Sequence, residues 1–464
     1  MAGLVLVDIL SSLEYVMVLT ALPAIVRDFG DIASASWVMT AFLLAQAVSA
    51  AVGGRLGDMF GRRRVLVLVV AAAAIGSLVS AFAPSPQLVV LGRAIQGVSG
   101  AILPLCFGIT RQIAPANSSA FWISVLTGSY MISALVGYVL GGYLADVGHW
   151  RWIFHVTALY SCIAIIPLLT LVPEPAQDRR SQRFDYLGAI LFAPAVAALL
   201  YAITASRKLG WSNMSTGGLL VASIAALGLW FAHEWRCKDP LIDVKLLRRR
   251  PIWLGNACGA IMSLGLAQLP VLTLLLLQQP RLAGFGFAVS GAVAGLMKLP
   301  SNLSAAVGAP LSGWIAGRSG ARWATLIGAL AGSAAWTSLY HFHDTILQVV
   351  AATVLAGFAN AMLLASIPNL VLEGAPAERT SEVTGLSSVV RAVCAAIGAQ
   401  LMAVLLARSE RLDPASGARF PSEAAYELVF LSIALSAALV VVICVAPPLG
   451  QTRRLRQNDT SVAG

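Results

Sequence analysis

Long apolar runs repeat along this chain, and they limit what it can fold into more than any other feature. Fourteen runs of roughly 20 residues follow one another with short polar gaps, and each is long enough to cross about 30 Å of hydrocarbon as a helix. Only 11% of the 464 residues are charged, whereas a soluble domain carries about 25%. A transmembrane β-barrel would show alternating segments of about 10 residues instead. The sequence therefore predicts an all-α polytopic membrane protein.

The apolar runs give the expected transmembrane spans. They are 3–27, 35–56, 64–84, 88–112, 118–144, 152–172, 186–204, 216–235, 253–278, 288–316, 323–341, 346–372, 382–407 and 426–447. The first run begins without a basic leader or a cleavage site, so we expect a retained helix and not a signal peptide.

The distribution of basic residues predicts the orientation of the chain. If both termini lie in the cytoplasm, 20 of the 31 Lys and Arg residues fall in cytoplasmic segments, 8 in outer segments and 3 within spans. Such a bias marks the cytoplasmic side of a membrane protein. It predicts a multi-pass protein of the cytoplasmic (inner) membrane with both termini in the cytoplasm. It also explains the net charge of +10 without a nucleic-acid partner.

Two polar, basic segments predict the division into domains. Residues 173–185 and 236–251 bracket the seventh and eighth spans, which therefore resemble an inserted pair. We expect an N-terminal six-helix bundle at 1–173, a linker with two additional helices at 174–252, a C-terminal six-helix bundle at 253–450 and a cytoplasmic tail at 451–464.

The loop between the second and third spans reads GRLGDMFGRRRVL (54–66), and it resembles the loop signature of the major facilitator superfamily. The matching residues include three glycines, one acid and two arginines: Gly54, Gly57, Asp58, Gly61, Arg62 and Arg63. The resemblance implies that Asp58 and the following arginines form a gate that latches two helix bundles from the cytoplasmic side. A weaker copy, GWIAGRSG (313–320), has Gly317 where Asp58 stands, so we expect a one-sided latch.

Five further motifs extend the resemblance along the chain. LVVLGRAIQGVSGA (88–101) and HWRWIFHV (149–156) resemble superfamily patterns of the fourth and sixth helices. ALPAI (21–25), SWVMTAFLLA (36–45) and SEVTGLSSVVRAVCAAIGA (381–399) resemble the 14-helix branch, the multidrug:proton antiporters. The resemblance implies a major facilitator fold with 14 transmembrane helices. It also implies secondary active export of amphipathic organic compounds or drugs, coupled to protons, by alternating access around a midplane cavity.

Two departures from this branch bear on the transport mode. Glu14 stands where the branch usually has an Asp, and it keeps the carboxyl group that proton coupling needs. Gly137-Tyr138 stands where the exporters usually have Gly-Pro, and the missing Pro removes a helix-bending element. A proton symporter or uniporter for an anionic or zwitterionic metabolite therefore stays open as an alternative.

Five charged residues lie inside the expected spans: Asp8, Glu14, Arg93, Lys298 and Arg391. A charge at the bilayer centre costs at least about 2.5–3.5 kcal/mol, so such residues usually serve a function. Glu14 lies about 11 residues, or roughly 16 Å, into the first helix, where desolvation penalises its charged form and suits reversible protonation. We expect Glu14, Asp8 and Arg93 to carry proton coupling. A structural ion pair of Glu14 with Arg93 or Arg391 is the alternative.

Five residues are candidates for the substrate cavity: Lys298, Arg391, Gln96, Gln46 and Tyr138. Lys298 could bind an anionic group of the substrate, neutralise Glu14 or serve the structure alone. The embedded charges sum to +1, from three cations and two acids, which leans toward an anionic or zwitterionic substrate. Interhelical hydrogen bonding is the commoner role of a residue such as Gln46.

No pattern in the sequence points to an enzyme. The six cysteines show no paired spacing, the five histidines are scattered, and no phosphate-binding loop occurs, so we expect no metal and no cofactor. The proton gradient is the expected energy source. The expected partners are a small-molecule substrate and the lipid bilayer, and the protein is expected to act as a monomer. A membrane receptor or enzyme is a distant alternative, because no soluble domain is present.

Overall fold

Helices account for almost all of the computed structural model. It describes residues 1–29, 32–115, 118–147, 149–173, 184–209, 213–281, 286–289, 291–412 and 419–445. The first elements are α1 (Ala2–Phe29), α2 (Ile32–Phe60), α3 (Arg62–Ala81), α4 (Pro86–Gln96), η1 (Gly97–Ala101), α5 (Ile102–Ile113), α6 (Ser119–Val147) and α7 (Arg151–Leu171). Then follow α8 (Tyr186–Leu209), α9 (Met214–Arg236) and η2 (Val244–Arg248).

The last part of the chain is helical as well, apart from one short hairpin. Its helices are α10 (Arg250–Leu264), η3 (Leu266–Gln268), α11 (Leu269–Gln278), α12 (Gly291–Met297), α13 (Leu299–Ser319), α14 (Ala321–His341), α15 (Ile346–Gly374), η5 (Ala377–Arg379), α16 (Thr380–Leu406) and α17 (Glu423–Val445). Strands β1 (Glu410–Leu412) and β2 (Arg419–Pro421) pair antiparallel between α16 and α17.

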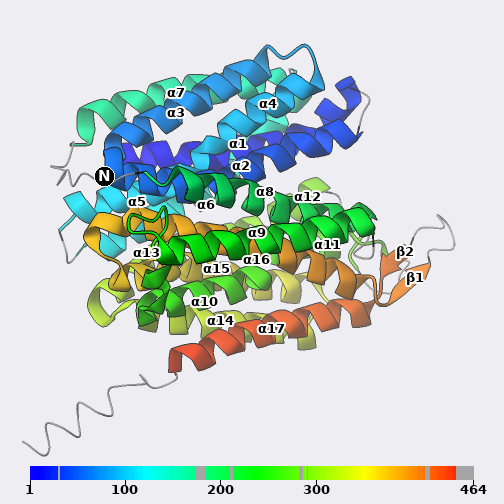
Figure 1. Ribbon diagram of the computed structural model, residues 1–464. Coiled ribbons are helices and arrows are strands. Elements are labelled where there is room, and N and C mark those ends of the chain that lie inside the picture. Colours follow the sequence, from blue (N-terminus) through cyan, green and yellow to red (C-terminus); the bar gives the residue numbers. More distant parts are fainter. Residues whose placement is uncertain are drawn as a thin grey trace, which may run out of the picture.

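The helices gather into two bundles. In the N-terminal bundle, α1 packs against α6 and α7, and α3 packs against α4 and α7. In the C-terminal bundle, α15 packs against α10, α13 and α14, while α17 packs against α14. Figure 1 shows the blue-to-cyan helices α1–α7 on one side and the yellow-to-red helices α13–α17 on the other. The two bundles meet where α2 contacts α16 and where α6 contacts α13 and α15.

Helices α8 and α9 form a pair that lies beside both bundles. They pack against each other, and α8 also contacts α2 and α16 (Figure 1). This placement agrees with the inserted pair expected from the sequence, although the predicted domain boundaries stay predictions. The expected tail at 451–464 and most of the basic segment 173–185 lie outside the described residues.

The prediction of an all-α polytopic membrane protein is confirmed. The described residues hold 12 helical segments that are long and apolar enough to cross a membrane. Helices α13 and α14 have 21 residues each and are not among these segments, so the count of fourteen spans stays a prediction.

Three spans that the sequence predicts as single helices are interrupted. The span 88–112 contains a 3-10 turn at Gly97–Ala101, and the span 253–278 is broken at Gly265, where α10 ends and a 3-10 turn begins. The span 288–316 breaks at Lys298, between α12 and α13. Prolines stand in the first turn of α11 and of α13, where a missing N–H is tolerated, and they favour a helix start there over a continuous helix.

The bundles approach each other closely along a seam between α2 and α16. The missing side chain of Gly54 leaves room for the backbone carbonyl of Ser381, and the missing side chain of Gly385 leaves room for the carbonyl of Ala50. Small residues at such positions let two helix backbones approach each other within a membrane. One glycine from each bundle therefore allows the backbones of α2 and α16 to approach each other along this seam.

A side chain placed on this seam should force the bundles apart. We expect Gly385→Val to destabilise the joined state by about 1–3 kcal/mol, because its Cβ would collide with the Ala50 carbonyl. Nitroxide labels at the exposed positions Arg64 and Glu378 would report the separation by pulsed electron resonance. Gly228→Val is the matched control, since nothing lies within 4 Å of that position. An unchanged distance distribution in Gly385→Val would contradict the role of the seam.

Candidate functional site

Asp58 joins the two bundles at the end that carries residues 54–66, which we call the latch end. Its Oδ2 accepts a hydrogen bond of 2.8 Å from the backbone N–H of Glu382, in the first turn of α16. Its Oδ1 accepts one of 2.7 Å from Nε of Arg62. The Asp58 side chain is only 2% exposed. A carboxylate at a helix N-terminus satisfies a free N–H and interacts favourably with the helix dipole.

Arg62 extends the same connection. Its Nη1 donates to the carbonyl of Gly108 in the N-terminal bundle, at 2.8 Å, and its Nη2 donates to the carbonyl of Ala377 before α16, also at 2.8 Å. Arg63 points elsewhere, since it donates to the carbonyls of Leu168 and Leu169 on α7. Of the two arginines expected in the latch, Arg62 therefore crosses between the bundles, whereas the two carbonyls that accept from Arg63 belong to the N-terminal bundle.

The glycines of the motif allow these contacts. Gly57 lies against the side chain of Leu105, and Gly61 has a φ of 106° at the turn between α2 and α3, where other residues would be strained. Gly54 lies on the seam described above.

A second ion pair completes the latch end. Arg55 Nη1 lies 3.0 Å from Oε2 of Glu382, and these two side chains are 2% and 0% exposed. The other carboxylate oxygen of Glu382 accepts the backbone N–H of Asp243 at 2.7 Å. Asp243 in turn pairs with Arg379 at 2.7 Å. The segment that follows the inserted pair therefore takes part in the junction.

Sequence reasoning missed Glu382 and Arg111 as members of this site. Arg111 Nη1 donates to the carbonyl of Ala375, at 2.8 Å, and to Oγ1 of Thr380, at 3.2 Å. In the sequence, Arg111 is a charge near the end of an apolar run, and Glu382 is the second residue of the motif at 381–399, whose resemblance assigns it no role. A charged residue at a span end is usually a topology signal, and no local pattern tells that it has a partner in the other bundle.

The other junction, between α6 and α13, is made differently. Gly313 lies against Phe121 and Ser124, and Asn369 of α15 donates to Ser124 Oγ at 3.0 Å and to the Ala120 carbonyl at 3.3 Å. The described contacts here involve no charged group. The copy at 313–320, which has Gly317 in place of the acid, meets the N-terminal bundle through Gly313, and the one-sided latch stays a prediction.

Glu14 lies inside the N-terminal bundle with a 0% exposed side chain. Neither of its carboxylate oxygens has a hydrogen-bond partner. Arg93 is the neighbouring cation, and the hydroxyl groups of Ser77 and Ser99 are close by. Arg93 Nη1 donates to the backbone carbonyl of Glu14 at 3.3 Å and not to its carboxylate. The pair is therefore close without being a closed salt bridge.

Arg93 connects three helices around Glu14. Its Nε donates to the Val38 carbonyl of α2 at 3.3 Å, and its guanidinium carbon lies 4.0 Å from the centre of the Phe42 ring. Nη1 also donates to Gln96 Oε1 at 2.9 Å, and Gln96 donates to Ser77 Oγ at 2.6 Å. Gln96, a candidate for the substrate cavity, thus takes part in the network within the bundle.

Asp8 lies on the same helix as Glu14 but faces α6. Its Oδ2 accepts a hydrogen bond from Ser129 Oγ at 2.8 Å, while its Oδ1 has no partner. One turn further, Ser12 donates to Ser133 Oγ at 2.5 Å. The polar stripe of α1 therefore forms part of a helix–helix contact, and Asp8 and Glu14 belong to two separate polar clusters.

The remaining cavity candidates are spread over the molecule. Arg391 on α16 is partly buried and donates to Ser388 Oγ at 3.2 Å. Lys298 lies at the junction of α12 and α13, and its Nζ donates to the Pro270 carbonyl at 3.1 Å. Gln46 is partly buried on α2 beside Gly100. The side chain of Tyr138 lies outside the described part of the chain.

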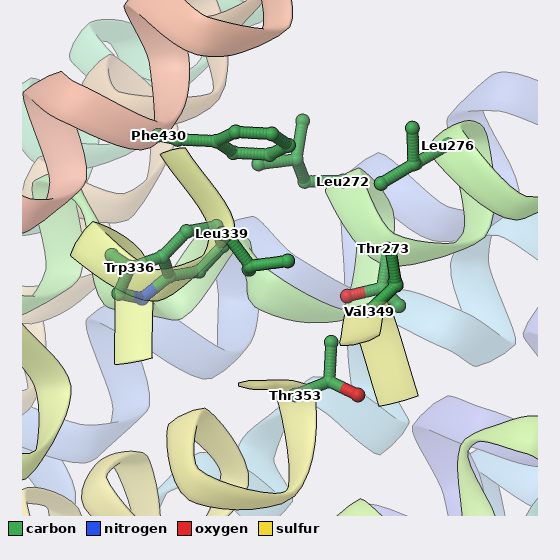
Figure 2. A pocket seen from close by; sticks show the side chains of 8 residues that line it. All are labelled: Leu272, Thr273, Leu276, Trp336, Leu339, Val349, Thr353 and Phe430. Carbon is green, nitrogen blue, oxygen red and sulfur yellow. The ribbon is translucent and has the colours of Figure 1, made fainter. Parts of the chain in front are cut away.

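The aromatic residue Trp336 serves the core of the C-terminal bundle. It lines a narrow apolar gap that has no room for a water-sized sphere (Figure 2). Phe430 lies across this gap, with its ring centre 5.9 Å from that of Trp336. A more open hollow of about 540 Å³ lies beside the second half of α6, at Val136, Val139 and Tyr143.

At the far end of the N-terminal bundle, the HWRWIFHV motif ties α7 to α1 and α3. Asp28 Oδ2 accepts the indole N–H of Trp150 at 3.0 Å and Nη1 of Arg151 at 3.2 Å, and Arg151 also donates to the Ala83 carbonyl at 3.0 Å. These hydrogen bonds, that of Trp150 first, lower the pKa of Asp28 below its usual value. The motif therefore serves the structure, since its hydrogen bonds fix the start of α7 against the end of α1 and the residues after α3.

The sequence of this chain is similar to a family model and to the sequences of known resistance and export proteins. The family model of the Major Facilitator Superfamily matches residues 4–304 and 287–462. The multidrug resistance protein Stp of Mycobacterium tuberculosis (strain CDC 1551 / Oshkosh) is 30% identical over 409 residues, which cover 87% of this chain and 75% of Stp. The tetracenomycin C resistance and export protein of Streptomyces glaucescens is 26% identical, over 85% of this chain and 73% of that protein. The putative multidrug resistance protein MdtD of Escherichia coli O81 (strain ED1a) is 29% identical, over 86% and 83%.

Solved structures agree on the fold. The human organic anion transporter MFSD10 (TETRAN) superimposes with a TM-score of 0.67 at 17% identity, covering 96% of this chain and 98% of that one. The proton:xylose symporter XylE superimposes with a TM-score of 0.66 at 14% identity, covering 96% and 95%. At these identities the likeness extends to the fold alone.

Removing the charge of Asp58 should weaken the latch without unfolding the bundles. A hydrogen bond to a charged group contributes about 1.5–3 kcal/mol, so we expect Asp58→Asn to reduce the joined population roughly tenfold or more. The label pair at positions 64 and 378 would report this shift. Asp239→Asn, at an exposed site, is the matched control. If Asp58→Asn instead abolishes expression, the motif serves folding and topology only.

Proposed function

The chain is a secondary transporter of the major facilitator superfamily, from its multidrug branch, and on this premise we propose that it exports amphipathic organic compounds or drugs in exchange for protons. The resistance and export proteins among its relatives support the direction and the kind of cargo. The proposal places the protein in the inner membrane with both termini in the cytoplasm, acting as a monomer without a cofactor.

The burial of the Glu14 carboxyl group is the observation that supports the proposal of proton coupling. Its carboxyl group is fully buried, and neither oxygen has a hydrogen-bond donor. A buried charge without partners is costly, and a proton or a nearby cation reduces that cost. Arg93 stands beside Glu14 and keeps its own hydrogen bonds to backbone carbonyls. The site can therefore accommodate Glu14 in its neutral, protonated form. It can also accommodate the negatively charged form, which the positive charge of Arg93 stabilises.

The arrangement supports a link between this proton and helix packing. Arg93 on α4 bonds the backbone of α1 at Glu14 and that of α2 at Val38. Loss of the proton from Glu14 adds a negative charge next to this three-helix contact, and the guanidinium then has a carboxylate to pair with. In our proposal, this change of partner biases the relative position of α1, α2 and α4.

The alternative is a proton symporter or uniporter for an anionic or zwitterionic metabolite. Arg391 favours it, since the hydrogen bond to Ser388 is the one described for its guanidinium group and no described carboxylate pairs with it. Lys298 is a second cation whose described bond goes to a carbonyl oxygen. These two residues suit an anionic group on the cargo of either an exporter or a symporter.

Reconstitution of the purified protein in vesicles with an imposed pH gradient distinguishes the transport modes. Substrate movement against the direction of proton flow supports the antiporter. Movement in the same direction supports the symporter, and movement independent of the gradient supports the uniporter. Absence of flux for a broad panel of amphipathic compounds would contradict all three.

Replacing the buried carboxyl group should uncouple transport from the proton gradient. We expect Glu14→Gln to lower gradient-driven flux at least tenfold, because the amide cannot exchange a proton. Substrate exchange at equal pH on both sides should persist, since it needs no net proton movement. Asp344→Asn, which neutralises an exposed carboxylate, is the control. An equal loss of both fluxes would mean that Glu14 serves the structure.

The charge of Arg391 should select among substrates. We expect Arg391→Gln to reduce transport of anionic and zwitterionic compounds by roughly tenfold and to spare cationic ones of similar size, because one charge contact contributes about 1.5–3 kcal/mol. Competition assays with matched anionic and cationic compounds measure this difference. Arg408→Gln, at an exposed position, is the control. Equal effects on both classes would place Arg391 outside the cavity.

A further inference from the structure

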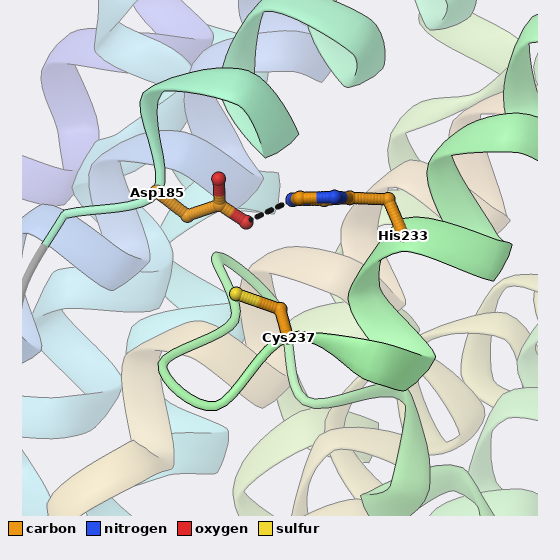
Figure 3. Close-up of side chains that lie close together, drawn as sticks. All are labelled: Asp185, His233 and Cys237. Carbon is orange, nitrogen blue, oxygen red and sulfur yellow. Dashed lines mark hydrogen bonds and ion pairs between the residues drawn. The ribbon is translucent and has the colours of Figure 1, made fainter.

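Three side chains of different chemistry meet where the inserted pair begins and ends. Asp185 precedes α8, His233 lies in the last turn of α9, and Cys237 follows that helix. One ligand atom from each of the three residues lies within 4.8 Å of the other two. Figure 3 shows Asp185 and His233 approaching from opposite sides, with the Cys237 sulfur turned into the same space.

The local structure fixes each of these side chains. The Asp185 Oδ1 accepts the N–H of Gly188 at 2.8 Å, which leaves Oδ2 directed at His233 Nε2, also at 2.8 Å. His233 and Cys237 are one helical turn apart, and the N–H of Cys237 bonds the carbonyl of His233 at 2.9 Å. Residues four apart lie on one face of a helix. The ring and the sulfur are therefore presented together to Asp185.

A carboxylate, an imidazole and a thiolate form a ligand set that transition metals prefer. Zn²⁺ binds oxygen, nitrogen and sulfur at about 2.0–2.3 Å, so donors around one ion lie roughly 3–4 Å apart. The described donors need to move by less than about 1–2 Å to reach that spacing. The side chains of Asp185 and His233 are 6% and 26% exposed, which keeps one side of the group open to a further ligand.

We propose that Asp185, His233 and Cys237 form a binding site for a divalent transition metal, with Zn²⁺ as the ion that this ligand set suits best. The site has three protein ligands and leaves a fourth position to solvent. The scattered histidines of the sequence gave no hint of it, because Asp185 is 48 residues away from His233. The only local signal is the sequence HEWRC (233–237), whose spacing of four places two ligands on one helix face.

An ion bound at this site would affect the segment that connects the inserted pair to the latch. Asp243 lies six residues after Cys237 and donates its N–H to Glu382 in the latch. Glu234, in the last turn of α9, accepts the indole N–H of Trp230 at 2.9 Å and the N–H of Ile242 at 3.3 Å, so this carboxylate already has partners. An ion at the site would cross-link the ends of α8 and α9 at the base of the segment that reaches the latch.

Cobalt is the probe that tests the site, because Co²⁺ bound to a thiolate has a sulfur-to-metal charge-transfer band. We expect the reduced, tag-free protein in detergent to show this band on titration with Co²⁺, and Zn²⁺ to displace it. Cys237→Ser should abolish the band, and His233→Asn should weaken binding by roughly 10–100-fold or more. Cys162→Ser, which removes an exposed cysteine, is the matched control and should leave the band unchanged.

Two readouts keep a negative result meaningful. The monodisperse elution and melting temperature of each metal-free variant show whether it folds. Co²⁺ binding without the charge-transfer band would place the ion elsewhere, for example at His343, Glu423 and Glu427, which offer no sulfur. That result, a band that survives Cys237→Ser, or no binding to the folded protein would overturn the proposal. None of these outcomes depends on whether the protein moves protons or drugs.

Discussion

The hydrogen bonds of Asp58 hold the described arrangement of the two bundles together. A carboxylate from one bundle satisfies a backbone N–H in the first turn of a helix in the other, at 2.8 Å, and is itself fixed by Arg62. Water is excluded from this contact, so its charges interact more strongly than they would at a surface. The buried pair of Arg55 and Glu382 lies one turn away and depends on the same approach of α2 to α16. If the bundles separate, Asp58 loses the N–H of Glu382 and Arg55 loses the Glu382 carboxylate at the same time, which favours an all-or-none separation.

The position of the latch explains why the seam uses glycine. Hydrogen bonds to backbone groups of the opposite bundle require the two helices to be almost in contact. Gly54 and Gly385 provide that approach, one from each bundle. The α6–α13 junction uses Gly313 in the same manner but without an acid, so the binding energy between the bundles is unevenly distributed over the two junctions. The segment after the inserted pair adds to the charged junction, where Asp243 pairs with Arg379.

Much of the fold was predictable because hydrophobicity alone decides which segments enter a membrane. Asp58 was identified by its motif, and Glu14 as one of the two acids in the first apolar run. The partners of these residues were not predictable in the same way. Glu382 lies 324 residues after Asp58, and its local sequence shows no reason for burial. The break at Lys298 was also missed, because Pro300 reads equally as a kink within a long helix or as the start of a new one. Contacts between helices that are distant in the sequence depend on how the helices pack. The same packing decides whether a proline kinks a helix or starts a new one, and a single sequence does not show it.

Helix α2 is the element that the proposed proton site and the latch have in common. Its Val38 carbonyl and Phe42 ring contact Arg93, beside Glu14. Its other end carries Gly54, Arg55 and Asp58, which meet α16. Twenty residues separate Val38 from Asp58, which is about 30 Å along a helix at 1.5 Å per residue. The structure describes one unbroken helix over this distance, so a rotation or shift of its Arg93 end is passed to its latch end. In the proposed mechanism, a proton at Glu14 and the separation of the bundles bias each other through this single rigid element, which the Asp58 contact joins to the other bundle.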